Sequence, residues 1–149
     1  MTPDLLLHLV FRFIHIVSVI AFLGGVFYAR WVLVPVLNSL PEDLRMQSAA
    51  GAQLRYRRIL FVLLALIVGS GLFNFLAGPK HGETYQIWFG IKMLFVAHIL
   101  SAAILWASSP YGDVKIAGTS KRRLLSVAIS GIIVVFISAW LRSLSQRGL

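Results

Sequence analysis

The chain has 149 residues, of which 58% are hydrophobic and only 13% charged, and its mean hydropathy is +0.84. Soluble domains carry about 45–50% apolar and about 25% charged residues, so this composition excludes a soluble globular domain. The sequence has no cysteine, which excludes disulfides, CxxC redox pairs, iron–sulfur clusters and thioether-attached haem. We attribute the net charge of +9 to membrane topology and contact with anionic lipid, because a basic groove for nucleic acid needs a soluble face.

Four apolar segments predict membrane-spanning helices, because about 20 such residues cross a hydrocarbon core of about 30 Å. The expected fold class is therefore all-α, an integral membrane four-helix bundle. It forms a single transmembrane domain, 1–149, with spans at approximately 7–37, 58–78, 86–108 and 124–142. The first span lacks the pattern of a cleavable signal and is expected to stay in the mature protein. Its apolar run is longer than one bilayer is thick, so the span should tilt or extend into the cytoplasm.

After the first span, Pro41-Glu42-Asp43 predicts a helix start with Ser39 as the N-cap. The stretch 41–58 is expected to form a short surface helix that leads into the second span.

The distribution of basic residues predicts the orientation in the membrane, since cytoplasmic loops carry an excess of Lys and Arg. The two loops that follow the first and third spans hold nine of these residues: Arg30, Arg45, Arg55, Arg57, Arg58, Lys115, Lys121, Arg122 and Arg123. The opposite side holds three: Lys80, Arg142 and Arg147. Both termini are therefore predicted to lie outside, in an inner (cytoplasmic) membrane.

The first span carries four polar side chains on one helical face: His8, Arg12, His15 and Ser18. Ionisable groups inside spans are costly and usually face protein or an aqueous cavity, where they mark function. His8 and Arg12 are close enough to the outer interface to snorkel. His15 lies deeper and is the stronger candidate for a functional residue.

The third span carries Lys92 and, about 9 Å deeper, His98. Lys92 and His15 both fall in the outer half of the membrane, so we expect them to share one cavity, although Lys92 alone can also snorkel outward. Two histidines from different spans can serve as axial ligands of a haem iron. His15 and His98 are the best such pair, with His8 in reserve. The serines of the second and fourth spans, Ser70 among them, are expected to make interhelical hydrogen bonds.

Two segments resemble the HemJ-type protoporphyrinogen oxidases and, more broadly, the CopD-like four-helix membrane proteins. The run from Arg12 to Tyr28 is similar to the first helix of that family, in which a basic residue precedes a key His by three positions and Gly-x-Phe-Tyr follows. The segment Trp88-Phe-Gly-Ile-Lys92 resembles the third helix, and Tyr56-Arg57-Arg58-Ile59 the entry to the second. The Asn-Glu-x-Pro signature before the last helix is replaced by Thr119-Ser-Lys-Arg-Arg123.

This resemblance implies a membrane redox protein that handles haem or porphyrin and passes electrons toward the quinone pool. It implies haem b as cofactor and His15 as its ligand or as an electron-transfer residue. Lys92 would be the catalytic partner of His15 and pair with a porphyrin propionate. The cofactor would supply the electron chemistry, and the protein would supply position and a low dielectric.

Two other functions fit the sequence. The missing signature and the small loops are also typical of a non-catalytic accessory subunit in a larger respiratory or photosynthetic complex. A CopD-like copper transporter ranks last, because copper(I) prefers sulfur ligands and the three methionines do not cluster. The partners expected are the lipid bilayer, a tetrapyrrole, and either a second copy of the chain or a larger membrane complex.

Overall fold

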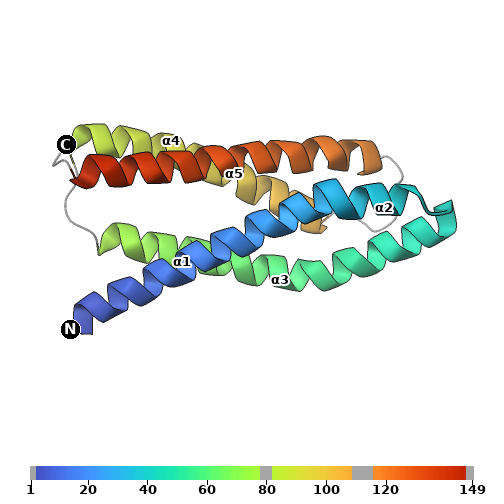
Figure 1. Ribbon diagram of the computed structural model, residues 1–149, viewed down its shortest axis with the longest axis horizontal. Coiled ribbons are helices and arrows are strands. Elements are labelled where there is room, and N and C mark those ends of the chain that lie inside the picture. The colour runs from blue at the N-terminus through green and yellow to red at the C-terminus, as the bar shows by residue number, and fades with distance from the viewer. Residues whose placement is uncertain (1–2, 78–81, 109–115, 147–149) are drawn as a thin grey trace. The chain divides into compact units, whose positions relative to one another are not determined.

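The computed structural model describes residues 3–77, 82–108 and 116–146. Nearly all of these residues lie in helices: α1 Pro3–Tyr28, a π-helical turn η1 Ala29–Leu33, α2 Val34–Asn38, α3 Glu42–Leu76, α4 Glu83–Ser108 and α5 Ile116–Gln146 (Figure 1). Lys80, Lys115 and Arg147, which entered the charge count above, lie outside the described residues.

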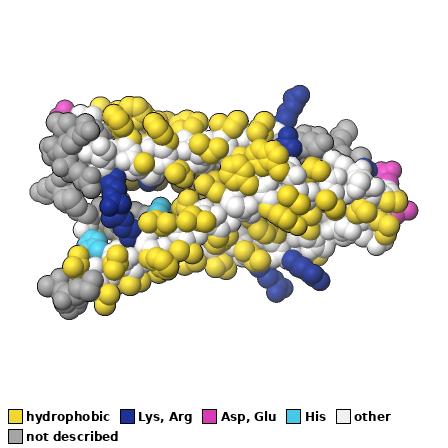
Figure 2. Space-filling view, viewed as in Figure 1, with side chains coloured by type: hydrophobic (Ala, Val, Ile, Leu, Met, Phe, Trp, Pro, Cys, Tyr) yellow, Lys and Arg dark blue, Asp and Glu magenta, His cyan; other side chains and the backbone are white. Residues whose placement is uncertain are grey.

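Four stretches are long and apolar enough to cross a membrane: Leu5–Asn38, Glu42–Leu76, Glu83–Trp106 and Arg122–Ser143. The predicted all-α fold and its four membrane-spanning segments are thus confirmed. Large apolar side chains lie on the outside of the helices, as Figure 2 shows, with Phe13 and Leu94 66% and 72% exposed. Such a surface suits hydrocarbon, where helices satisfy their own backbone hydrogen bonds.

The chain divides into two compact units, Met1–Pro79 and Lys80–Leu149. In the first, here called the N-terminal hairpin, α1 packs against α3; in the second, the C-terminal hairpin, α4 packs against α5 (Figure 1). Each hairpin joins two consecutive spans, the arrangement that short connections favour.

The N-terminal hairpin is antiparallel, because contacts move backward along α3 as they move forward along α1. The ring of His8 lies 5.6 Å from that of Phe73, while the ring of Tyr56 packs on Gly25 near the other end. Phe11 stacks on Phe73 with ring centroids 4.0 Å apart. Four apolar side chains of the same two helices are buried: Phe22, Val26, Leu60 and Leu64.

The connection between the first two spans differs from the prediction in two ways. Ser39 does not cap α3; it ends α2, and its hydroxyl donates to Val36 O at 2.7 Å. The N-cap of α3 is Pro41, which makes no side-chain hydrogen bond. Glu42 and Asp43 lie in the first turn, where their negative charges stabilise the helix by interacting with its dipole. No separate surface helix forms, because nothing breaks the helical pattern and α3 continues for 35 residues.

The buried side chains of the C-terminal hairpin include small and apolar ones. Ile99 and Ala103 of α4 are buried, as are Ala128 and Ile137 of α5, and Ala128 is only 1% exposed. Gly131 of α5 is also buried, and a residue without a side chain there permits close helix contact.

The contact between Gly25 and Tyr56 gives a test of the N-terminal hairpin. A Cβ added at Gly25 would overlap the hydroxyl of Tyr56 and lie 3.0 Å from its Cζ, whereas a Cβ at Gly24 meets nothing within 4 Å. We expect Gly25→Ala to lower the free energy of unfolding in detergent by about 1–3 kcal/mol, because overpacking forces the ring to move.

The matched control is Gly24→Ala, which should leave stability unchanged or raise it by up to about 1 kcal/mol, because alanine favours helix. Adding Tyr56→Phe to Gly25→Ala should restore part of the loss, since it removes the overlapping oxygen. Equal thermal stability of the two alanine variants would contradict the packing described.

Candidate functional site

The polar face of α1 is directed largely toward α3. His8 and His15 are half-buried and contact α3, and Ser18 is only 4% exposed. Arg12 is exposed. Of the four polar side chains predicted on one face of α1, His8, His15 and Ser18 are therefore buried or half-buried, and Arg12 is exposed.

His15 is hydrogen-bonded to α3 through Nδ1 of its ring. Its Nδ1 lies 3.0 Å from the carbonyl oxygen of Ile67 and 3.0 Å from Oγ of Ser70. The Ser70 hydroxyl donates its own hydrogen to a carbonyl one turn back, that of Leu66. Both partners of Nδ1 therefore act as acceptors, because a carbonyl cannot donate and the serine hydrogen is already used.

This network fixes the tautomer of a neutral His15 ring: Nδ1 carries the hydrogen and Nε2 carries the lone pair. Histidines that bind metals show the same arrangement, with the non-ligating N–H donated to a carbonyl or another acceptor that sets the ring orientation. Gly71 places backbone beside the ring, since a Cβ there would lie 3.1 Å from His15 Cε1. His15 is thus a ring held in a defined orientation within a membrane span.

Lys92 is half-buried in α4, and its Nζ lies 6.0 Å from the ring centroid of Phe89. This distance allows a cation–π attraction within one turn of the same helix. No ion pair of Lys92 with a described carboxylate is seen; an ion pair within α3 joins Arg45 to Glu42 at 3.7 Å. Lys92 belongs to the C-terminal hairpin, so its predicted cavity with His15 stays a prediction.

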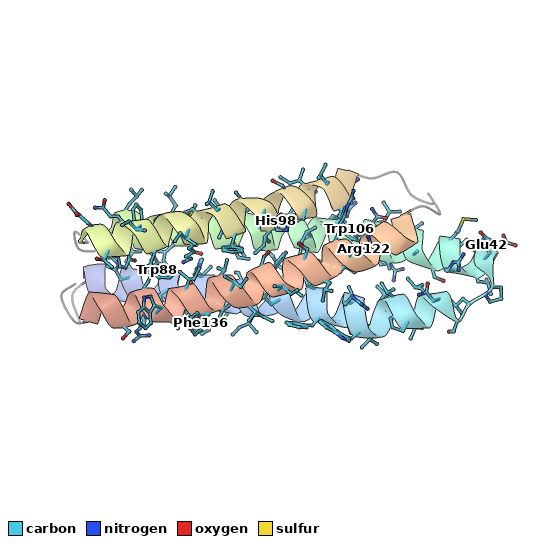
Figure 3. The ribbon with its side chains drawn as sticks, turned by 90° about the horizontal axis from the view of Figure 1, so that it is seen from above. Glu42, Trp88, His98, Trp106, Arg122 and Phe136 are labelled. Atoms are coloured by element: carbon cyan, nitrogen blue, oxygen red, sulfur yellow. The ribbon has the colours of Figure 1, made fainter. Side chains whose placement is uncertain are left out.

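His98 links the two helices of the C-terminal hairpin. Its Nε2 lies 2.8 Å from Oγ of Ser126, and in Figure 3 the residue stands on the side of α4 that faces α5. By contrast, Phe136, on the side of α5 turned away from α4 in the same view, is 71% exposed. A metal at Nε2 of His98 would have to displace the serine, so the pairing of His98 with His15 as axial ligands also stays a prediction.

The sequence predicted His15 as a functional residue and an interhelical hydrogen bond from Ser70, which is confirmed, but not that the two bond to each other. The Ile67 carbonyl has no signature, because any residue supplies a carbonyl. The run Gly69-Ser70-Gly71 gave a partial signal, since small residues let helices approach closely. The described residues contain no group of three or more His, Asp or Glu side chains that could hold a metal ion.

Comparisons of this chain with protein-family models, with curated proteins and with solved structures gave no match.

The tautomer of His15 can be measured directly. In protein labelled with ¹⁵N at histidine, we expect His15 to show a protonated Nδ1 and an unprotonated Nε2, with the resonances assigned by their loss in His15→Gln. Ser70→Ala should keep this tautomer, because the Ile67 carbonyl still accepts. A hydrogen on Nε2 alone would contradict the network.

Proposed function

We propose that this chain is a membrane redox protein that handles haem or porphyrin and passes electrons toward the quinone pool. We place it in an inner (cytoplasmic) membrane with both termini outside, as the basic residues predict. The observation that supports the proposal is the His15 ring, whose Nδ1–H is donated to α3 so that Nε2 presents the lone pair an iron ligand needs.

The residues present fit a b-type haem in three respects. His15 offers a ring nitrogen as ligand, and its other ring nitrogen, Nδ1, is already hydrogen-bonded to α3. Gly71 lets the α3 backbone lie close beside the ring. Arg12 lies one turn before His15 on the same helix, where a cation can pair with a propionate. Lys92 is the second candidate for this role. The surrounding span is apolar and supplies the low dielectric that tunes such a cofactor.

Haem b, when bound, supplies a reversible one-electron iron couple. Two electrons and two protons convert one quinone to its quinol, so each two-electron oxidation of a porphyrinogen substrate, which releases two protons, is balanced by one quinone. In this scheme His15 holds and orients the cofactor, and the Ile67 carbonyl and Ser70 keep the His15 hydrogen on Nδ1. His98 is the candidate for the second ligand.

The test is a dithionite-reduced minus oxidised absorbance spectrum of the protein purified in mild detergent. We expect a b-type α-band in the wild type and its loss in His15→Ala. His8→Ala is the matched control, because His8 lies two turns away on the same helix and packs on Phe73, and this variant should keep the band. Retention of the band in His15→Ala, or its loss only in His8→Ala, would contradict the assignment of His15.

Two further variants refine the result. His98→Ala should shift the band if His98 is the second ligand and leave it unchanged if it only bonds Ser126. Gly71→Ala should alter the band, because the added Cβ would crowd the His15 ring at 3.1 Å, whereas Gly69→Ala adds a Cβ in open space and should not. A flat spectrum in the wild type would overturn the haem proposal and favour the accessory subunit, which should then co-purify with a larger membrane partner.

A further inference from the structure

Two polar side chains of the C-terminal hairpin are exposed on membrane-spanning helices and are bonded to each other. They are His98 of α4 and Ser126 of α5, whose Nε2 and Oγ atoms lie 2.8 Å apart. A neutral imidazole and a hydroxyl each have one hydrogen to donate, and the bond between them uses one of the two. No other hydrogen bond of either side chain to a described residue is seen. The pair therefore has one hydrogen left to donate.

Two other serines of the same helices have no such spare hydrogen, because their hydroxyls return it to their own helix. Ser101, which is also exposed on α4, donates to the carbonyl of Ala97 at 2.8 Å. Ser138 of α5 donates to the carbonyl of Val134 at 2.6 Å. A donor without an acceptor is costly in a lipid environment. The spare hydrogen of the His98–Ser126 pair thus indicates an acceptor outside the described residues.

The pair lies one helical turn inside the edge of the hydrocarbon core. The charge-free run of α5, 124–141, is about 27 Å long at 1.5 Å per residue, close to the thickness of about 30 Å of a bilayer core. Arg122 comes just before this run, at headgroup depth, and Ser126 lies about 6 Å deeper on the same stripe of the helix. Arg122 is exposed, and no ion pair of this residue with a described carboxylate is seen.

Farther into the membrane the surface beside the pair is apolar. Ile129, three residues after Ser126, is 50% exposed, and Leu94, four residues before His98, is 72% exposed. Since α5 turns back along α4, both apolar side chains lie deeper than the polar pair (Figure 1). From the edge of the membrane inward, this surface therefore presents a guanidinium, a hydrogen-bond donor and hydrocarbon.

We infer that Arg122, Ser126 and His98 form a binding site for an anionic phospholipid. A phospholipid presents its groups in the matching order: phosphate, ester carbonyl and acyl chain. The guanidinium suits the phosphate oxygens in geometry and charge, and the ester carbonyl accepts the spare hydrogen of the pair. An acyl chain then lies along Ile129 and Leu94. A free phosphate ion would use the arginine alone, so this arrangement favours a lipid.

The test uses the full chain, delipidated in detergent and examined by native mass spectrometry. The probes are phosphatidylglycerol, its diether analogue without ester carbonyls, phosphatidylcholine and inorganic phosphate. We expect phosphatidylglycerol to bind about three- to tenfold more tightly than phosphatidylcholine, and R122Q to remove most of this preference. H98L/S126A should weaken binding of the ester lipid about three- to tenfold, the loss of one hydrogen bond, and leave binding of the diether lipid unchanged.

Two variants serve as matched controls. R123Q removes the same charge from the neighbouring exposed position, but Arg123 is followed one turn later by the buried Val127, so it is not aligned with Ser126. S101A removes an exposed hydroxyl whose hydrogen is already donated to its own helix. Both controls should bind phosphatidylglycerol as the wild type does.

Several results would overturn the inference. They are equal binding of phosphatidylglycerol and phosphatidylcholine, equal losses in R122Q and R123Q, an equal effect of H98L/S126A on the ester and diether lipids, and full displacement of the lipid by millimolar inorganic phosphate. A shift of the haem band in His98→Ala would also overturn it, because iron at Nε2 would displace Ser126. Should H98L/S126A fail to fold, R122Q against R123Q and the wild-type preference for the ester over the diether lipid still decide.

Discussion

A polar ring inside a membrane-spanning helix needs a hydrogen-bond acceptor, and water is absent at that depth to supply one. His15 finds its acceptors on α3, at the Ile67 carbonyl and the Ser70 hydroxyl. This requirement fixes how α1 and α3 pack: the Ser70 hydrogen must go to a carbonyl one turn back, and a residue without a side chain must stand beside the ring, as Gly71 does. The rest of the interface, from the Phe11–Phe73 stack to the Gly25–Tyr56 contact, is compatible with that one register.

Helix length is the second constraint on the N-terminal hairpin. At 1.5 Å per residue the 35 residues of α3 extend about 52 Å, far more than the hydrocarbon core. The excess lies on the side of the Ser39–Pro41 connection, where arginines and Trp31 replace the purely apolar surface. The hairpin therefore contains two chemically different levels: a histidine held within the hydrocarbon and arginines at its edge. The redox proposal rests on the first level.

The sequence predicted the features that depend on composition and periodicity. Apolar length predicted four spans, and spacing placed His8, His15 and Ser18 on the face of α1 that contacts α3 or is buried. The sequence-based prediction was wrong for the N-cap of α3. Ser39 is a residue type that often caps helices, but Pro41 is the N-cap of α3, and the hydroxyl of Ser39 bonds to α2. The Ile67 carbonyl as acceptor and the π-helical turn at Arg30 could not be predicted from the sequence for another reason. Any residue supplies a backbone carbonyl, and a helix irregularity depends on packing and not on one residue type.

The two histidines with described hydrogen bonds differ in a way that bears on their roles. The partners of His15 Nδ1 act only as acceptors, so the hydrogen stays on Nδ1 and the same nitrogen, Nε2, always presents the lone pair. The partner of His98 is the hydroxyl of Ser126, which can donate or accept, so either tautomer of His98 satisfies that bond. A ligand to iron benefits from the first arrangement, because no reorganisation of the ring is needed on binding. The second suits a helix-to-helix contact that tolerates change. Among the histidines that the sequence suggested as iron ligands, the hydrogen-bond chemistry therefore favours His15. The role of His98 as its partner depends more strongly on contacts outside its own hairpin.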